Sequence, residues 1–257
     1  MTHFRPMDRT PHLVSVVVPL FNEEENLPQL YERLVAAAAR WGCRWELVCV
    51  DDGSRDGTYE WLQRRHERDP RVKAISLSRN FGHQIALSAG LQYATGDAVV
   101  VIDGDLQDPP EEIHLLIEQW RAGHQVVYGV RTKRKENWAK RSAYHVFYRL
   151  LARMAPLEIP LDAGDFCLLD RVVVDWLNRM PERNRFVRGL RSWLGFRQIG
   201  VTYERQPRAA GTAKYTLRQL VRLARDGIIN FSYRPLELIG AFGVLVAAAS
   251  FATMVFM

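Results

Sequence analysis

The stretch from Asp103 to Glu111 holds the residue types best suited to bind a metal ion. It reads Asp-Gly-Asp-Leu-Gln-Asp-Pro-Pro-Glu and follows the apolar run 98–102, which is typical of a buried strand. If the segment stays extended, Asp103 and Asp105 point to the same side, and two carboxylates ~6–7 Å apart repel each other by ~2–3 kcal/mol at an effective dielectric constant of about 20. A divalent cation relieves that repulsion, and Mg²⁺ is commonly held by one or two carboxylates together with phosphate oxygens.

The same stretch also fits a solvated acidic turn in front of a helix. In that interpretation Asp108 is the N-cap of the helix and Pro109 opens its first turn. The two interpretations are compatible, because Asp108 can cap a helix while Asp103 and Asp105 bind a metal.

Two further polar loops favour the metal interpretation, since each follows an apolar run. They are residues 19–24 and 51–57. The carboxyl ends of neighbouring parallel strands converge on one crevice, so all three loops are expected to meet there. Asp52 is suited to accept hydrogen bonds from a base or ribose. Three of its neighbours fit plain turn and cap roles equally well: Asp51, Ser54 and Asp56.

The first half of the chain alternates strand patterns with helix patterns. Near-continuous Val and Ile runs predict strands at 15–19, 46–50, 72–77, 98–102 and 125–130. Helices are predicted at 25–41, 57–68, 83–94 and 111–122. Continuous apolar strands indicate a sheet that is buried on both faces. We therefore expect an α/β fold with a doubly wound, mostly parallel sheet.

The last 20 residues, 238–257, contain no charged side chain. A helix of that length spans ~30 Å, the thickness of the hydrocarbon core of a bilayer, so the run predicts a transmembrane helix rather than a buried core helix. Arg218, Arg222, Arg225 and Arg234 precede it, and the positive-inside rule places the soluble part on the cytoplasmic face of the inner (plasma) membrane. Because no polar flank follows the run, we expect further membrane sequence beyond it.

Two basic amphipathic helix patterns, 138–154 and 215–231, precede that run. Basic amphipathic helices can lie in a membrane interface. The second pattern leads almost directly into the predicted span, which favours the interface there. For the first, an ordinary core-facing helix with a solvated face fits equally well.

Charge is unevenly distributed along the chain. The net charge of +6 combines −7 over residues 1–120 with +14 over residues 121–234. The basic half must face an anion: phosphates, acidic lipid headgroups or nucleic acid. The three cysteines, at 43, 49 and 167, show no metal-ligand or paired spacing, and the last two lie in apolar runs typical of the core.

Several catalytic motifs are absent from the sequence. No Gly-x-Gly-x-x-Gly follows a strand, which argues against a dinucleotide cofactor. There is also no P-loop and no Gly-x-Ser-x-Gly nucleophile elbow, which argues against ATP hydrolysis of the P-loop type and against an α/β-hydrolase serine.

Eight short segments carry a family resemblance. The first five are Val-Val-Val-Pro-Leu-Phe-Asn-Glu-Glu (16–24), Val-Asp-Asp-Gly-Ser-Arg-Asp-Gly-Thr (50–58), Arg-Asn-Phe-Gly-His-Gln (79–84), Asp-Gly-Asp-Leu-Gln-Asp-Pro-Pro-Glu (103–111) and Gly-Val-Arg (129–131). This series resembles the family-2 inverting glycosyltransferases with a GT-A fold. The other three segments, 164–166, 188–196 and 208–215, narrow the resemblance to one branch of the family, the polyprenyl-phosphate glycosyltransferases. This branch includes dolichyl-phosphate mannose synthases and bacterial undecaprenyl-phosphate glucosyltransferases. The Gln-x-x-Arg-Trp motif of processive synthases is absent.

The resemblance implies roles for the matched residues. The nucleotide would be held by Pro19, Phe21, Glu23, Val50, Asp52 and Asp103. Mg²⁺ or Mn²⁺ on the diphosphate would be bound by Asp103, Asp105 and Gln107. Phosphate groups of the donor and the acceptor would be bound by Arg131, Arg208 and Lys214. The reaction centre would contain Asp105, Asp165 and Arg131. Phe21 occupies a position that is often tyrosine in the family, so a hydroxyl contact is missing there.

The implied reaction is transfer of a sugar from a nucleotide-sugar to polyprenyl phosphate, with inversion. Resemblance to the bacterial branch favours UDP-glucose and undecaprenyl phosphate, while GlcNAc, mannose and aminoarabinose donors stay open. A phosphate monoester is close to a dianion at neutral pH, because its second pKa is about 6, so it needs little help from a general base. We therefore expect Asp165 to position the acceptor or the sugar; a structural role fits equally well.

The implied partners are the donor, the lipid acceptor and anionic lipid headgroups, with no nucleic acid and with room for a homo-oligomer. We expect a GT-A catalytic domain at 1–213, an amphipathic interface region at 214–235 and a transmembrane helix at 236–257. Two other classes compete. A nucleotidyltransferase would usually open with a Gly-rich phosphate loop, which is absent. A non-catalytic, membrane-anchored module that binds anions through its basic half would not need the converging carboxylates.

Overall fold

The computed structural model describes residues 10–131, 163–182, 185–206 and 234–256. The chain divides into two compact units. The described part of the first unit comprises everything up to residue 206, and that of the second is the helix 234–256. Both predicted basic amphipathic segments, 138–154 and 215–231, lie outside the described residues, as do Arg208 and Lys214.

The described part of the first unit is built on a seven-stranded sheet with the order β3-β2-β1-β4-β6-β5-β7. The strands are β1 (Leu13–Leu20), β2 (Arg44–Asp51), β3 (Val72–Ser76), β4 (Ala98–Val101), β5 (Val126–Arg131), β6 (Ala163–Asp170) and β7 (Gln198–Tyr203). All neighbours are parallel except β6, which is antiparallel to both β4 and β5. The five predicted strands are confirmed to within a few residues; β6 and β7 were not predicted.

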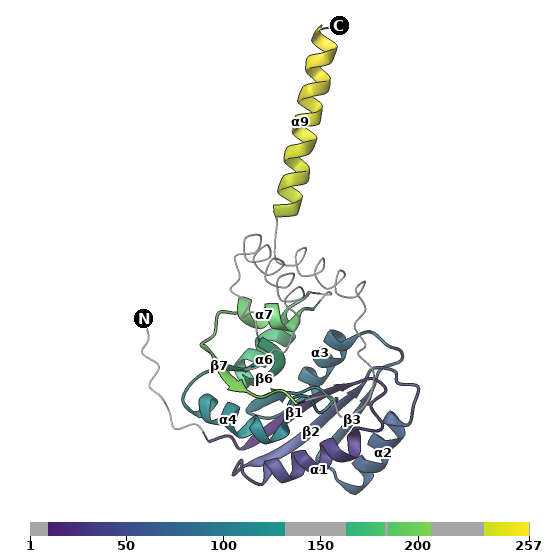
Figure 1. Cartoon of the computed structure of the whole chain (residues 1–257), viewed down its shortest axis with the longest axis vertical. Coiled ribbons are helices and arrows are strands. Elements are labelled where there is room, and N and C mark those ends of the chain that lie inside the picture. The colour runs from purple at the N-terminus through teal and green to yellow at the C-terminus, as the bar shows by residue number, and fades with distance from the viewer. Residues whose placement is uncertain (1–9, 132–162, 183–184, 207–233, 257) are drawn as a thin grey trace. The chain divides into compact units, whose positions relative to one another are not determined.

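Helices cover both faces of this sheet (Figure 1). They are α1 (Leu27–Ala38), α2 (Thr58–Arg68), α3 (His83–Tyr93), the short η1 (Pro110–Glu112), α4 (Ile113–Arg121), α6 (Arg171–Arg179) and α7 (Val187–Trp193). Helices pack on both faces because successive side chains of a strand point to opposite faces of the sheet. Val16 and Val18 of β1 join the core cluster that includes side chains of α1, α2 and α4, whereas the intervening Val17 packs against Gly90 of α3. The sequence-based prediction of an α/β fold with a mostly parallel sheet buried on both faces is confirmed.

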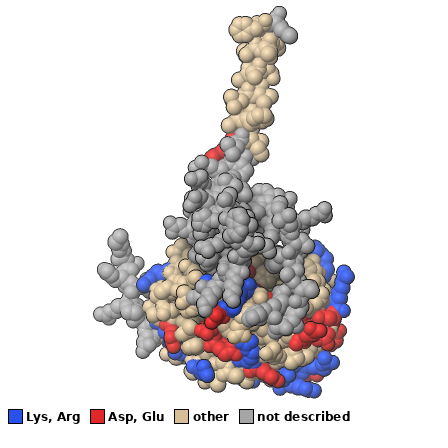
Figure 2. All heavy atoms as spheres, in the orientation of Figure 1, with Lys and Arg blue, Asp and Glu red and all other residues tan. Residues whose placement is uncertain are grey.

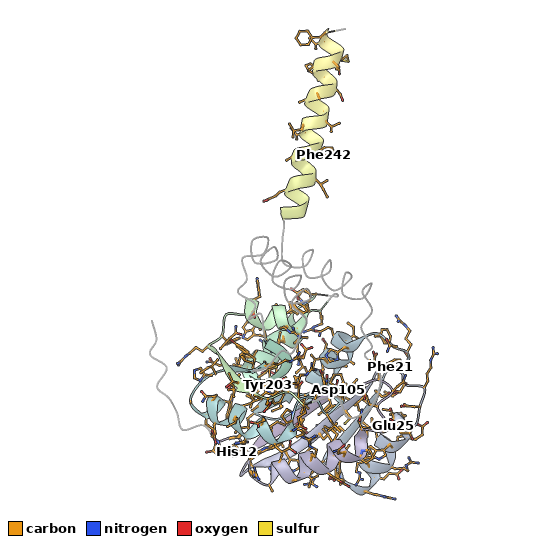
Figure 3. All side chains as sticks on the ribbon, viewed as in Figure 1. His12, Phe21, Glu25, Asp105, Tyr203 and Phe242 are labelled. Atoms are coloured by element: carbon orange, nitrogen blue, oxygen red, sulfur yellow. The ribbon has the colours of Figure 1, made fainter. Side chains whose placement is uncertain are left out.

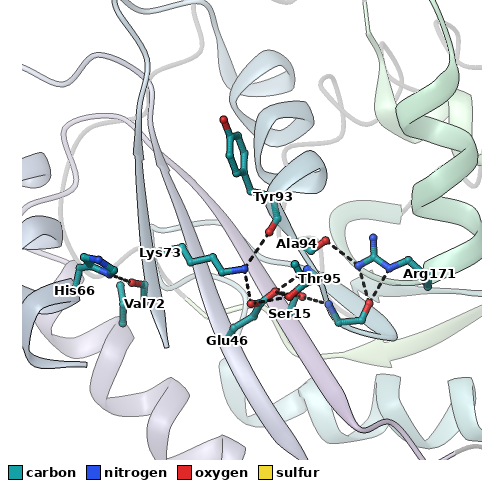
Figure 4. Close-up of polar contacts among 10 residues, drawn as sticks. Ser15, Glu46, His66, Val72, Lys73, Tyr93, Ala94, Thr95 and Arg171 are labelled. Carbon is teal, nitrogen blue, oxygen red and sulfur yellow. Dashed lines mark hydrogen bonds and ion pairs between the residues drawn. The ribbon is translucent and has the colours of Figure 1, made fainter. Parts of the chain in front are cut away.

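A buried polar network closes the amino-terminal edge of the sheet (Figure 4). Ser15 of β1 lies opposite Glu46 of β2 and donates to its carboxylate at 2.6 Å. The backbone N–H of Thr95 donates to the same carboxylate at 2.7 Å, and Lys73 Nζ lies 2.7 Å from it. Arg171 at the start of α6 donates to the Gly96 carbonyl at 2.6 Å. The turn between α3 and β4 is thereby tied to β1, β2, β3 and α6. This network lies at the opposite end of the strands from the polar loops 51–57 and 103–111.

The second unit contains the helix α9 (Arg234–Phe256). Its segment Ile239–Phe256 has a mean hydropathy of 2.1 and is long and apolar enough to cross a membrane. Figure 2 shows this helix with almost no charged atoms along its length. The predicted apolar helix is confirmed as a candidate membrane span by length and composition.

Candidate functional site

The sheet register brings four predicted or newly found polar residues to one edge. Val101 at the end of β4 pairs with Cys167 of β6, and continuing this antiparallel register beyond the strand places Asp103 beside Asp165. On the other side of β6, Arg131 at the end of β5 pairs with Tyr203 at the end of β7. Because β4, β5 and β7 end here while the antiparallel β6 begins here, the edge collects side chains from both halves of the chain.

His83 bridges the two carboxylates. Its Nε2 lies 3.3 Å from Asp165 Oδ2 and 3.8 Å from Asp103 Oδ1. Arg188 of α7 completes the group, with its Nη2 at 3.1 Å from Asp165 Oδ1. Asp165 therefore faces one cation with each oxygen. His83 owes its place to the turn before it, where Gly82 adopts φ of +100° and lets α3 begin with the imidazole directed at the sheet edge.

The charges of this group reinforce one another. Burial alone would lower the pKa of His83, but the ion pair with Asp165 and the charge of Asp103 raise it to about 9, so the imidazole is a cation at neutral pH. Burial alone would raise the pKa of Asp165, but the charge of Arg188 and the contact with His83 hold it well below its usual range. Asp165 is thus a firmly ionised carboxylate between two cations.

Asp103 is in the opposite electrostatic situation. Burial and the neighbouring carboxylates of Asp108, Asp165 and Asp105 raise its pKa to about 6, although His83 opposes that shift. Its Oδ1 is shielded from solvent and makes no hydrogen bond within the described residues. Crowded carboxylates with an unsatisfied oxygen favour a bound cation.

The residues that would hold such a cation offer only oxygen ligands. The carboxylates of Asp103 and Asp105 and the amide of Gln107 suit Mg²⁺ or Mn²⁺, which prefer hard oxygen donors. Within the described ranges, no group of three or more His, Cys, Asp or Glu side chains forms a metal site by itself.

Residues 103–108, here called the aspartate loop, turn rather than stay extended. Leu106 adopts φ of 60° while its side chain is buried in the core, which anchors the loop from below. The Gln107 N–H donates to Asp105 Oδ1 at 3.1 Å, a turn closed by the aspartate side chain. The Gln206 N–H donates to the Gln107 carbonyl at 2.9 Å, which ties the loop to the segment after β7. Figure 3 labels Asp105 and Tyr203 in this region.

The prediction that Asp108 is a helix N-cap is wrong. Pro109 precedes η1, and no side chain caps that helix. The Asp108 carboxylate is instead fully buried and accepts a hydrogen bond from the Tyr203 hydroxyl, with Arg205 Nε 3.6 Å away. An aspartate before a proline can either cap a helix or serve as a buried hydrogen-bond acceptor. The sequence pattern is the same in both cases, and only the position of Tyr203 on β7 shows that Asp108 is a buried acceptor.

The residues expected to hold the nucleotide line the ends of β1 and β2. Pro19 and Val50 are buried within the strands, whereas Phe21 and Glu23 are partly exposed on the loop after β1. Asp52 is almost fully buried, and its two oxygens accept the backbone N–H groups of Phe81 and Gly82 at 2.7 and 2.8 Å. This carboxylate therefore fixes the turn that starts α3.

The alternative role proposed for the other residues of the second loop is confirmed. Asp51 accepts from the Ser54 N–H at 3.1 Å, and Ser54 Oγ accepts from the Asn22 N–H at 2.9 Å. Asp56 accepts from the Thr58 N–H at 3.1 Å, at the start of α2. The contacts of Asp51 and Asp56 close turns within the second loop, and that of Ser54 joins the second loop to the first.

Four residues of the site, His83, Arg188, Tyr203 and Arg205, were not predicted from the sequence. His83 and Arg188 fall inside segments quoted for the family resemblance, so their presence in those motifs was a usable signal. Tyr203 and Arg205 carried none, because β7 itself was not predicted. Arg191, a turn further along α7, is 1% exposed and adds a charge that also lowers the pKa of Asp165.

Comparison with known proteins identifies the family of the chain. Residues 15–177 match the family described as Glycosyl transferase family 2. An uncharacterized glycosyltransferase of Bacillus subtilis is 49% identical over 241 residues, which cover 93% of this chain and 75% of the relative. A protein of Escherichia coli K12 named prophage bactoprenol glucosyl transferase homolog is 41% identical, covering 93% of this chain and 78% of the relative.

A solved structure supports the fold. The glucosyl-3-phosphoglycerate synthase of Mycobacterium tuberculosis, crystallised with Mn²⁺, uridine diphosphate and phosphoglyceric acid, aligns with a TM-score of 0.57 at 20% identity, covering 83% of this chain and 75% of that one. Taken together with the match over residues 15–177 and the 49% identical relative, this assigns the chain to glycosyl transferase family 2, with a GT-A fold.

Proposed function

We propose that this glycosyltransferase moves a glucosyl group from UDP-glucose to undecaprenyl phosphate, with inversion at the anomeric carbon. The observation that carries the proposal is the cluster at the sheet edge, where His83 lies between Asp103 of the aspartate loop and Asp165, and Arg188 lies beside Asp165. The name of the 41% identical Escherichia coli relative supports the choice of bactoprenol, a polyprenol, and of glucose. Transfer of GlcNAc, mannose or aminoarabinose to the same acceptor is the alternative.

In this proposal the donor lies over the ends of β1, β2 and β4. The nucleoside is held by Pro19, Phe21, Glu23, Val50 and Asp52. Asp103, Asp105 and Gln107 hold Mg²⁺ or Mn²⁺, which when bound neutralises the diphosphate of the leaving group. The Mn²⁺ present in the Mycobacterium tuberculosis structure is consistent with a divalent ion.

The phosphate groups of the donor and of the lipid acceptor are held by arginine and lysine side chains, namely Arg131, Arg208 and Lys214. A phosphate oxygen forms the new bond to the anomeric carbon while the bond from that carbon to the donor diphosphate breaks, and UDP leaves with the bonding electrons. The attacking oxygen carries no proton that must first be removed, because the second pKa of a phosphate monoester is about 6.

Asp165 therefore positions groups rather than accepting a proton. Its two oxygens face Arg188 at 3.1 Å and His83 at 3.3 Å, so the carboxylate sets the orientation of both cations. His83 in turn faces Asp103 at 3.8 Å. The group stabilises negative charge that develops on the leaving diphosphate, an electrostatic contribution of the kind that usually dominates such catalysis.

We infer how the chain is arranged at the membrane from its charge-free run 238–257 and from the arginines that precede this run. A catalytic domain at 1–213 and an interface region at 214–235 precede the transmembrane helix at 236–257, and the catalytic domain faces the cytoplasm. The candidate span Ile239–Phe256 supports the membrane attachment. A membrane-attached enzyme meets its lipid acceptor in two dimensions, which suits a substrate that does not leave the bilayer.

The test is a donor panel with the full chain in detergent or lipid vesicles. UDP-glucose, UDP-GlcNAc, GDP-mannose and a UDP-aminoarabinose are each incubated with Mn²⁺ or Mg²⁺, with and without undecaprenyl phosphate, and nucleoside diphosphate release is measured. We expect release that requires the lipid and is fastest with UDP-glucose. Lipid-dependent release with another donor would move the proposal to its alternative. In a separate incubation with UTP and glucose 1-phosphate, formation of pyrophosphate and UDP-glucose would instead indicate a nucleotidyltransferase. No lipid-dependent release with any donor would contradict transfer to undecaprenyl phosphate.

A further inference from the structure

Tyr203 connects two parts of the site that come from opposite halves of the chain. It is the last residue of β7, pairs with Arg131 of β5 and is 4% exposed. Its ring packs edge-on against Phe166 at 5.2 Å between ring centroids. The aromatic ring is therefore held by the core, and the hydroxyl is carried to the sheet edge.

The hydroxyl has a partner on each side. It donates to the buried carboxylate of Asp108, the last residue of the aspartate loop. Arg131 Nε donates to the same hydroxyl at 3.5 Å. A tyrosine hydroxyl can donate one hydrogen bond and accept others, so this geometry uses both capacities at once.

The other side of Arg131 is shaped by a glycine. A Cβ added to Gly164 of β6 would lie 2.9 Å from Arg131 Nη2, closer than real Cβ atoms approach a neighbour. The guanidinium thus lies across Gly164 and reaches the Tyr203 hydroxyl. β6 and β7 together determine where the arginine points.

We propose that Tyr203 is a positioning residue, whose hydroxyl sets the guanidinium of Arg131 relative to the aspartate loop. The inference rests on the proposed function, in which Arg131 binds a phosphate group of a substrate. Through this link, the phosphate held by Arg131 keeps a fixed distance from the loop that holds the metal and the diphosphate. Gly164 contributes by leaving room for the guanidinium.

The experiment compares kinetic constants of Tyr203→Phe and Arg131→Ala with those of the wild-type full chain, for donor and acceptor separately. Loss of a hydrogen bond to a charged group corresponds to about a tenfold change in an equilibrium constant. Arg131→Ala should raise the KM of the substrate whose phosphate Arg131 binds. We expect Tyr203→Phe to raise the KM of that same substrate by about tenfold, which is less than the effect of Arg131→Ala. Mn²⁺ binding, measured by calorimetry without substrates, should change by less than about twofold, because the loop is also tied through Gln107 and Gln206.

A double-mutant cycle separates this role from a structural one. In the Arg131→Ala background, Tyr203→Phe should cause almost no further loss, since the group it positions is gone. Tyr128→Phe is the matched control. Tyr128 lies on β5 three residues before Arg131, its ring packs under the guanidinium of Arg191 at 5.4 Å, and no hydrogen bond of its hydroxyl is found within the described residues. It should keep wild-type constants.

Gly164→Ala tests the position of the Arg131 guanidinium from the β6 side, because the added Cβ would lie where the guanidinium lies. This test does not depend on the folding of the Tyr203 variant. It should raise the same KM as Arg131→Ala. Additive losses in the cycle, or wild-type constants in both Tyr203→Phe and Gly164→Ala, would overturn the inference while leaving the proposed function intact. Wild-type constants in Arg131→Ala would instead contradict the phosphate role assigned to Arg131.

Discussion

Replacement of Glu46 tests the buried network at the amino-terminal edge of the sheet without touching the candidate site. Glu46→Ala leaves the donors of Ser15, Thr95 and Lys73 without their acceptor. Breaking a buried ion pair by removing one partner costs ~3–5 kcal/mol. The Lys73 side chain is 35% exposed, so solvent screens that part of the interaction and we expect a loss near ~3 kcal/mol. Glu46→Gln, which keeps an acceptor oxygen, should lose less.

The assay is thermal unfolding of the full chain in detergent, followed by circular dichroism. A loss of ~3 kcal/mol corresponds to a fall of ~6–12 °C in Tm for a domain of this size. Glu67→Ala is the control, because Glu67 is exposed on α2 and a surface change of that kind usually stays within ~0.5 kcal/mol. Activity per folded molecule should be unchanged in both variants, since the network lies at the sheet edge opposite the aspartate loop.

The stabilisation by Glu46 should depend on pH, and its direction follows from the pKa of the carboxyl group. Burial alone would raise the pKa of Glu46, but Lys73, Ser15 and Thr95 lower it below the ordinary value of 4.5. A carboxyl group whose pKa is lower in the folded state stabilises the protein above its unfolded pKa and loses that effect as the pH falls. The Tm difference between wild type and Glu46→Gln should therefore be full at pH 6–7 and shrink below about pH 4.5. A difference that grows on acidification, or a Glu46→Ala variant as stable as Glu67→Ala, would refute the reasoning.

Three further predictions concern the site and the membrane. Asp105→Ala should abolish metal-dependent turnover and weaken Mn²⁺ binding measured by calorimetry; unchanged turnover would remove the metal assignment. Asp165→Asn should keep measurable activity, whereas loss of a true general base would cost about 10²–10⁴-fold; a complete loss with intact donor binding would refute the positioning role. Because Asp165 pairs with Arg188 and His83, the same variant should also melt at a lower temperature. Removal of residues 234–257 should convert firm membrane attachment into salt-sensitive attachment in a flotation assay, and a truncated chain that stays fully soluble at low ionic strength would count against a basic interface region.

The part of the site at the ends of β1, β2 and β4 was predictable from the sequence because it depends on local patterns. Apolar runs located the strands, and a polar loop after each run located the ends of β1, β2 and β4. Parallel pairing then required those ends to meet, and no long-range register was needed. Asp52 and Asp105 were found in this way, although the backbone contacts that bury Asp52 are visible only in the fold.

The part of the site contributed by β6 and β7 was not predictable in the same way. Asp165 reaches Asp103 only because β6 enters the sheet antiparallel between β4 and β5, and this register comes after a connection of about 30 residues that constrains it little. The wrong cap assignment of Asp108 has the same origin. Its partner Tyr203 lies 95 residues later, and nothing near Asp108 in the sequence indicates a buried hydroxyl.

The antiparallel strand also explains why acidic and basic halves of the chain meet. A strand placed parallel between β4 and β5 would start at the opposite edge, carrying Gly164 and Asp165 away from the aspartate loop. Since β6 runs the other way, its first residues lie where β4 ends, and α7 then brings Arg188 to the same edge. The carboxylates of the aspartate loop come from a half with net charge −7, and Arg131, Arg188 and Asp165 come from a segment with net charge +14. Opposite charges that are distant in sequence but adjacent at one sheet edge can hold a phosphate-rich donor and an anionic acceptor side by side, which neither half could do alone.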